Sequence, residues 1–422
     1  MKKVSVGILK NGMRFYTQGD PSSNVSGIGV KCGSMHDPPG CVGLAHLVEH
    51  MLCRESRDFP GLSVDLMMEK YMGGPDADIN VRIDRSSTFY GHDSILYRQH
   101  MLECFNMYAS LLKDKTTNME ALQLESAAVH QEYYLYGIDY IPNLVDDLIH
   151  EVMYDRNPAR NRVDCRPEDL SAINLQRVSS FVRKYYVPSN MFIVLLGPSF
   201  HDSKKMVERL FGRLPQVESP KLDLDLSERF PNLTHTRSLE IERPGIHQYH
   251  LGIGFPTETY LSKDAEALDT LSRILAFRVK LKLREGNRDF NKGVYRALSY
   301  TPRTFAHGLI YVSVATTSAE FIREAEETII SECKRLREEP VSSEELEAMT
   351  RSLLYSYRNA FIKSPGVLSE LIIESVCNGD EDLIHLHSFR DRLRKVTRRK
   401  IMEVANKYFC LPNYGRVLIK PT

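Results

Sequence analysis

Two histidines and one glutamate give the clearest chemical signal in the sequence. The segment GLAHLVEH (residues 43–50) places them at His46, Glu49 and His50. Residues four apart on an α-helix lie on one face, so the two imidazoles can point to one place, as half of the tetrahedral shell of a zinc ion requires. Glu49 lies at the edge of that face. It can accept a proton from a water molecule whose pKa zinc has lowered, and pass that proton to a leaving amine.

The order H-x-x-E-H inverts the H-E-x-x-H helix of many zinc hydrolases. Five residues are only moderately specific, and the simpler explanation is a surface helix that happens to hold two histidines and a glutamate. A third protein ligand would favour the zinc site over a surface helix, because catalytic zinc usually has three protein ligands and leaves one position for water.

A second predicted helix, residues 119–135, offers carboxylates for that third position. Glu125 and Glu132 are seven residues apart, which is two helical turns, and Val129 lies between them on the same face. One glutamate could bind zinc while the other accepts a ring N–H of a histidine. A solvated face is the simpler explanation for such a pair, but apolar neighbours such as Leu124 favour a partly buried helix.

Two other sets of side chains are weaker candidate ligands. Cys53 lies seven residues after His46 and shares its face, and thiolate binds zinc well. A buried cysteine at the end of a helix is nevertheless the more common situation. His247 and His250 lie in a strand-like run and at that spacing point to opposite faces, so we do not expect them to bind a metal.

Composition restricts the class of protein. The chain has 422 residues, 42% of them hydrophobic, and its 55 basic residues balance its 55 acidic ones. This is ordinary globular composition with no overall charge to favour nucleic acid or an anionic membrane. The eight cysteines include no C-x-x-C pair, and no apolar run is long enough for a signal peptide or a membrane span. We expect a cytoplasmic protein of two to three domains.

The pattern of apolar residues predicts the elements that position these side chains. Strand-like segments with turns open the chain, and further along we expect a helix at 42–53, a strand at 79–90 and helices at 95–112 and 119–135.

Two phrases of the first half recur in the second. FVRKYYVPSNMFIVLLGP (181–198) is repeated in outline by VANKYFCLPNYGRVLIKP (404–421), and SGIGVKCGS (26–34) by HQYHLGIGFPT (247–257). The repetition predicts an α+β fold of two homologous α/β domains, each a mainly antiparallel sheet covered by helices. We place the domains at 1–213 and 237–422, with a proline- and charge-rich linker at 214–236.

These motifs together resemble the pitrilysin family of inverted zincins, which includes insulysin and mitochondrial processing peptidase, and the resemblance points to the subgroup of the latter. The matching phrases are LKNGMRFY (9–16), GIGVKCGSMHDPPGCVGLAHLVEHM (27–51), GGPDADINVRIDRSSTFY (73–90) and the pair of glutamates on the later helix. They occur in the family's order, and the resemblance covers essentially the whole chain. It implies that the two domains form half of a clamshell chamber.

The resemblance implies a role for each residue of the first domain's site. His46, His50 and Glu132 would bind one zinc ion per chain, Glu49 would be the base, and Glu125 would support a ligand. Cys53 falls where the family usually has a buried apolar residue.

In the family, a strand of the first domain also offers its free edge to an extended peptide. Asn80 and Val81 stand where that strand would contact substrate. Here Asn-Val replaces Asn-Ala, and Ile83 stands where threonine is common, so backbone pairing would persist while side-chain contacts change.

The second half resembles the family less closely. In LREGNRDFNKGVYRA (283–297), Tyr295 fits a tyrosine that stabilises an oxyanion. Arg284 has the context of the family's substrate-gripping arginine and Arg288 has its spacing, so the choice between them stays open. LDTLSRILA (268–276), at the position of the histidine helix, has no histidine, so zinc is expected only in the first domain.

The function implied by the resemblance is that of a zinc-dependent endopeptidase, which cleaves unfolded peptides or peptide precursors inside the chamber. Two domains make half of that chamber, so a homodimer or a heterodimer with a related chain is implied, without nucleic acid and without a membrane span. The first alternative is a non-catalytic scaffold or partner-binding member of the family. The second is an unrelated α/β protein with a chance motif.

Overall fold

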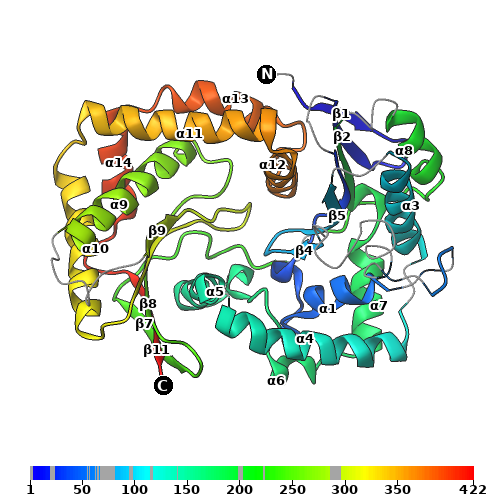
Figure 1. Cartoon of the computed structure of the whole chain (residues 1–422), viewed down its shortest axis with the longest axis horizontal. Coiled ribbons are helices and arrows are strands. Elements are labelled where there is room, and N and C mark those ends of the chain that lie inside the picture. Colours follow the sequence, from blue (N-terminus) through cyan, green and yellow to red (C-terminus); the bar gives the residue numbers. More distant parts are fainter. Residues whose placement is uncertain are drawn as a thin grey trace. The chain divides into compact units, whose positions relative to one another are not determined.

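The structure is a computed structural model that describes residues 3–19, 24–54, 56, 58–61, 63, 66, 81–94, 98–114, 117–139, 141–197, 203–221, 224–285 and 296–422. The chain forms two compact units, each assembled from three separate segments (Figure 1). Unit 1 comprises Met1–Tyr133, Val163–Asp223 and Ser356–His387. Unit 2 comprises Tyr134–Arg162, Leu224–Tyr355 and Ser388–Thr422.

Unit 1 is built on a six-stranded sheet with the order β1-β2-β6-β3-β5-β4. Strands β2 and β6 are parallel and the other neighbours are antiparallel. The strands are β1 (Ser5–Ile8), β2 (Arg14–Gln18), β3 (Asn24–Val30), β4 (Arg82–Ile83), β5 (Thr88–Ser94) and β6 (Met191–Leu196).

Unit 2 is built on a five-stranded sheet with the order β7-β11-β8-β10-β9, in which only β7 and β11 are parallel. The strands are β7 (Arg237–Arg243), β8 (Tyr249–Pro256), β9 (Arg296–Tyr300), β10 (Leu309–Thr316) and β11 (Gly415–Pro421). Without β1, the first sheet has the same order and the same strand directions. The prediction of two similar α/β halves with mainly antiparallel sheets is therefore confirmed.

Helices cover both faces of the sheet of unit 1. Figure 1 shows α3 and α12 on opposite sides of its strands. Helices α1 and α7 lie on the same face of the sheet as α3. The buried residues of these three helices form one core with the apolar side chains Ile28 and Val30 of β3. The helices of this unit are α1 (Leu44–Met51), α3 (Arg98–Asp114), the larger part of α4 (Met119–Asp139), α6 (Pro167–Leu170), α7 (Leu175–Tyr185), α8 (Ser203–Phe211) and α12 (Pro365–Cys377).

In unit 2, α9, α10 and α14 pack on one face of the sheet and α5 packs on the other. Glycines allow α5 to lie close, because a Cβ atom at Gly252 or Gly254 would be 2.8 Å from Val145 or 2.9 Å from Ile149. The repeated Gly-x-Gly of the two halves thus lies in strands of equivalent position, β3 and β8. The helices are α5 (Ile141–Met153), α9 (Ala265–Glu285), α10 (Glu320–Glu338) and α14 (Arg398–Tyr408); α11 (Ser343–Lys363) and α13 (Ile384–Leu393) contain unit boundaries.

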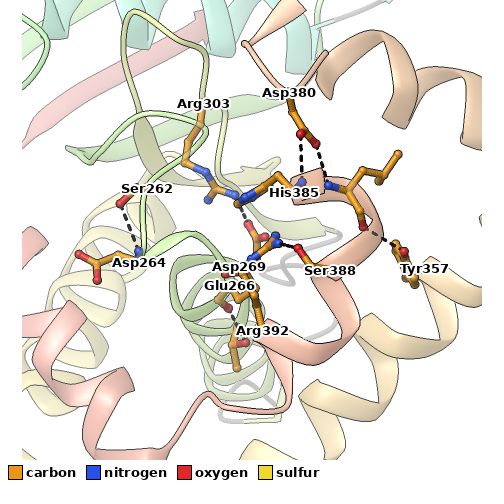
Figure 2. Close-up of polar contacts among 12 residues, drawn as sticks. Ser262, Asp264, Glu266, Asp269, Arg303, Tyr357, Asp380, His385, Ser388 and Arg392 are labelled. Atoms are coloured by element: carbon orange, nitrogen blue, oxygen red, sulfur yellow. Dashed lines mark hydrogen bonds and ion pairs between the residues drawn. The ribbon is translucent and has the colours of Figure 1, made fainter. Parts of the chain in front are cut away.

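Polar contacts fix several of these helices at their ends (Figure 2). Within unit 2, Arg303 donates to Asp269 at 2.8 Å, and Arg392 forms an ion pair with Glu266. Within unit 1, the carboxylate of Asp380 accepts the backbone N–H groups of His385 and Leu386 at 3.0 and 2.8 Å, which satisfies donors in the first turn of α13.

Across the part of the chain that the structure describes, no helix combines the length and the apolar character needed to cross a membrane.

Candidate metal centre

Helix α1, which holds the H-x-x-E-H residues, begins at a position that sequence and packing both specify. Gly43 precedes it with φ of +87°, and a Cβ atom there would lie 2.3 Å from the side chain of Cys165. Asp37 then caps the helix. One of its oxygens accepts the N–H of Gly43 and the other the N–H of Ala45, both at 2.7 Å. A carboxylate at this end satisfies donors that the helix leaves free and interacts favourably with its dipole.

Helix α4 contributes the two glutamates and is fixed by the residue between them. Val129 is 1% exposed and belongs to the core of unit 1. Because Glu125 and Glu132 lie one turn before and about one turn after Val129, burying Val129 directs both carboxylates toward the same neighbouring elements. The packing of Val129 in the core therefore explains why the two glutamates share the face that the sequence predicts.

The two helices bring three donor atoms together. Oε2 of Glu132 lies 3.5 Å from Nε2 of His46 and 3.0 Å from Nε2 of His50. The two imidazole rings are 5.0 Å apart between centroids. Glu49 is buried beside them, with its Oε2 3.7 Å from Nε2 of His50.

The other nitrogen of His50 is held by Glu125. Nδ1 of His50 lies 3.4 Å from Oε2 of Glu125, whose second oxygen accepts a hydrogen bond from Arg54 at 2.7 Å. This chain of contacts fixes the imidazole of His50 in orientation. By contrast, Nδ1 of His46 is buried and has no hydrogen-bond partner among the described residues.

The electrostatics of the cluster show a concentration of negative charge around the histidines. Burial disfavours a charged imidazole at His50, but its hydrogen bonds to Glu125 and Glu132 prevail and raise its pKa to about 10. Burial also opposes ionisation of Glu132, yet contacts with both histidines bring the pKa of this carboxyl below its usual range. Glu49 behaves differently, since burial raises its pKa.

The donor set fits a zinc ion. Two imidazole nitrogens and a carboxylate oxygen are ligands that zinc prefers, and ligand atoms about 2.0–2.2 Å from a tetrahedral zinc lie roughly 3.3–3.6 Å from one another. The distances of 3.5 and 3.0 Å from the Glu132 oxygen to the two histidine nitrogens are near those separations. Three protein ligands leave a fourth position open, as in catalytic sites.

One cluster suited to a metal emerges within the described ranges. It consists of His46, Glu49 and His50, with one donor atom of each within 4.8 Å of the others, and Glu132 adjoins it through both histidines. Cys53 is half-buried and is not in this cluster.

The structure describes only some of the remaining predicted site residues. Val81 is half-buried and directly precedes β4, the edge strand of its sheet, which packs against α1. Arg284 is exposed in the last turn of α9 in unit 2. Asn80, Arg288 and Tyr295 lie outside the described residues, so their predicted roles stay predictions.

Two residues of the site escaped the sequence analysis. Arg54 follows His50 by four residues, so helical spacing could have indicated a shared face with the histidines. Asp37 acts across six to eight residues of irregular chain on the N–H groups of Gly43 and Ala45. A loop of that kind has no periodicity from which the contact could be read.

His36 makes the segment that caps α1 sensitive to pH. It lies in the short helix η1 (Ser34–His36), is 3% exposed, and its Nδ1 lies 3.0 Å from the backbone nitrogen and 3.3 Å from the carbonyl oxygen of Gly33. Burial lowers the pKa of His36 to about 4. The unfolded chain, with a histidine pKa of about 6.5, therefore binds more protons below that pH, and the free energy of unfolding falls as pH drops from 6.5 toward 4.

We expect His36 to lower the free energy of unfolding by about 2 kcal/mol between pH 8 and pH 5. Urea unfolding of the wild type and of His36→Gln at both pH values measures it. The variant should lose less stability on acidification than the wild type by that amount. Equal losses would show that His36 is not held neutral by the fold.

Solved structures share this fold over the full chain. A protease from Helicobacter pylori matches with a TM-score of 0.83 and 16% identity, covering 100% of both chains. The peptidase M16 inactive domain from Pseudomonas fluorescens matches with a TM-score of 0.80 and 18% identity, covering 100% of this chain and 98% of that one. The architecture is thus that of M16 peptidase structures.

Family models identify the same group from the sequence. Residues 14–166 match the model of insulinase (peptidase family M16), and residues 172–353 match that of the peptidase M16 inactive domain. The chain belongs to the M16 peptidase family, the group that the sequence motifs resembled. It is also 23% identical to the uncharacterized zinc protease YmxG of Bacillus subtilis, over 98% of this chain and 97% of that protein.

Proposed function

We propose that the protein is a zinc-dependent endopeptidase whose metal is held by His46, His50 and Glu132. The observation that supports the proposal most directly is the approach of one Glu132 oxygen to both imidazoles, at 3.5 and 3.0 Å. Membership in a peptidase family and similarity to a protein named a zinc protease point to the same chemistry.

The residues around the ligands have complementary tasks. A zinc ion bound there supplies a Lewis acid and lowers the pKa of water. Glu49 is positioned beside His50 to take the proton of the attacking water and to return it to the leaving amine. Its burial raises its pKa, which suits a group that must both accept and release a proton. Glu125 holds the ring of His50, and Arg54 holds Glu125.

The substrate we propose is an unfolded peptide or peptide precursor. Strand β4 is an edge of its sheet and packs against α1, so an extended peptide could pair with it close to the histidines. Val81 and Asn80, just before β4, would then contact the substrate backbone. We further propose a chamber that encloses the peptide, completed by a second chain, either identical or related.

Removal of the metal tests this proposal. We expect dialysis against a zinc chelator to abolish hydrolysis of an unstructured fluorogenic peptide, and one equivalent of zinc to restore it, while magnesium does not, because magnesium prefers oxygen ligands and octahedral geometry. Cleavage that persists in protein shown by elemental analysis to be free of metal would contradict the proposal.

A non-catalytic scaffold is the competing function. It has no physical need for two histidines and a carboxylate within hydrogen-bonding distance of one another. This function would be supported if the zinc-loaded protein, alone and mixed with a related chain, failed to cleave any unstructured peptide of a diverse set.

A further inference from the structure

A cavity of about 550 Å³ lies on unit 1 between α7 and the segment that leads into α1. Its volume is within the range of small-molecule sites. The residues that line it include Leu44, Gln176, Arg177, Phe181, Lys184 and Tyr185. None of them is a candidate zinc ligand, so the inference drawn from this cavity does not depend on the proposed peptidase activity.

The floor of the cavity is apolar and aromatic. Leu44, Phe181 and Tyr185 are buried, with exposures of 1%, 4% and 3%. The rings of Phe181 and Tyr185 are 4.8 Å apart between centroids, and His36 meets Tyr185 edge-on at 5.2 Å. These tilted and edge-on rings line the cavity with an apolar surface against which a flat or aliphatic group can pack.

The rim is positively charged. Arg177 and Lys184 are exposed and lie seven residues apart on α7, which places them on the same face of the helix as the buried Phe181. Among the residues that the structure describes, no aspartate or glutamate lines the cavity. The nearest acidic residue in sequence, Asp37, has both carboxylate oxygens engaged by the N-terminus of α1. The described lining therefore carries no carboxylate to neutralise Arg177 and Lys184, and the ammonium of Lys184 lies over the ring of Tyr185, 4.8 Å from its centroid.

Arg177 is already held in position. One terminal nitrogen, Nη1, donates to the carbonyl oxygen of Ala172 at 2.5 Å and contacts the sulfur of Cys41 at 2.7 Å. Its Nε and Nη2 donate to no other described residue. A guanidinium fixed by one nitrogen loses little side-chain freedom when the others bind an anion, and its planar fork matches a carboxylate or a phosphate.

We propose that this cavity binds a small organic anion, with the anionic group at Arg177 and Lys184 and an apolar group on the aromatic floor. The carboxyl end of a peptide and a free small acid share this chemistry. The rim contacts the anionic group of the ligand and the floor contacts its apolar group. A ligand that carries both groups is therefore expected to bind more tightly than one that carries either group alone.

The absence of tryptophan from the chain provides a direct assay. Gln176→Trp, at the exposed edge of the cavity, creates a single tryptophan whose emission can be excited selectively at the red edge of its absorption. We expect 4-phenylbutyrate to change its emission saturably, and the neutral amide of the same compound to bind at least about tenfold more weakly, because it lacks the charge-assisted hydrogen bonds. Saturation-transfer NMR on the wild type provides a check that the new tryptophan has not created the site.

Variants separate the proposed contacts from general effects on folding. In wild-type and variant chains titrated by the same NMR method, Arg177→Gln and Lys184→Gln should each weaken 4-phenylbutyrate at least about tenfold. Lys205→Gln, which removes an exposed cation of unit 1 outside the cavity, should leave the affinity unchanged. Lys184→Gln keeps the test decisive if the loss of the Cys41 and Ala172 contacts prevents Arg177→Gln from folding.

The source of the anion is distinguished by N-acetyl-Gly-Phe and its amide. Tighter binding of the free carboxylate form than of 4-phenylbutyrate assigns the cavity to peptide ends, and weaker binding assigns it to small acids. The proposal is overturned if neither acid binds saturably, if the amides bind as tightly as the acids, or if both cavity variants bind like the wild type.

Discussion

Replacing Glu49 by glutamine is expected to lower peptide hydrolysis by about 10²–10⁴-fold, the contribution of a positioned general base. The amide has nearly the same shape but cannot accept a proton from water. Glu49 is 6% exposed and its pKa is raised by burial, so the neutral amide should be tolerated without loss of stability. Hydrolysis of an unstructured fluorogenic peptide at saturating zinc measures the effect.

Zinc content and the unfolding midpoint of Glu49→Gln should remain those of the wild type. Glu120→Gln is a matched control, because Glu120 is an exposed carboxylate in the first turn of α4, away from the histidines. It should keep full activity. If Glu49→Gln retains more than about a tenth of the wild-type rate, another group is the base.

Replacing Glu132 by glutamine is expected to weaken zinc binding by more than about 100-fold. Groups that only support a ligand typically contribute 10–100-fold, and a direct ligand must contribute more. The structure also predicts an order of effects along α4. Glu132 approaches both histidines, Glu125 approaches only the distal nitrogen of His50, and Glu120 lies outside the cluster.

Competition with a chromophoric chelator at fixed pH measures these affinities. We expect the loss of zinc affinity to be largest for Glu132→Gln, about 10–100-fold for Glu125→Gln, and negligible for Glu120→Gln. A greater loss for Glu125→Gln than for Glu132→Gln would reverse the assignment of ligand and support.

Local geometry explains what the sequence could predict about this site. The relation of His46 to His50, and of Glu125 to Glu132, follows from helical spacing alone. Spacing could not show that the two helices meet, because that contact depends on how Val129 and its neighbours pack in the core. Helical spacing offered both glutamates as the third ligand, and the family resemblance chose Glu132.

The fold shows the same division between local and long-range information. Strand and helix patterns, and the repeated phrases, predicted two similar α/β halves. They did not predict that α5, which lies within the predicted first domain, packs on the sheet of unit 2, or that α12, which lies within the predicted second domain, packs on the sheet of unit 1. Gly252 and Gly254 were visible in the sequence, but a glycine indicates close approach without naming the element that approaches.

Anomalous X-ray scattering at the zinc edge, from crystals of the zinc-loaded protein, tests the proposed metal site most directly. We predict one peak per chain, about 2.0–2.2 Å from Nε2 of His46, Nε2 of His50 and a carboxylate oxygen of Glu132. A peak bound by Glu49 or Cys53 in place of Glu132, or no peak at the histidines, would contradict the account.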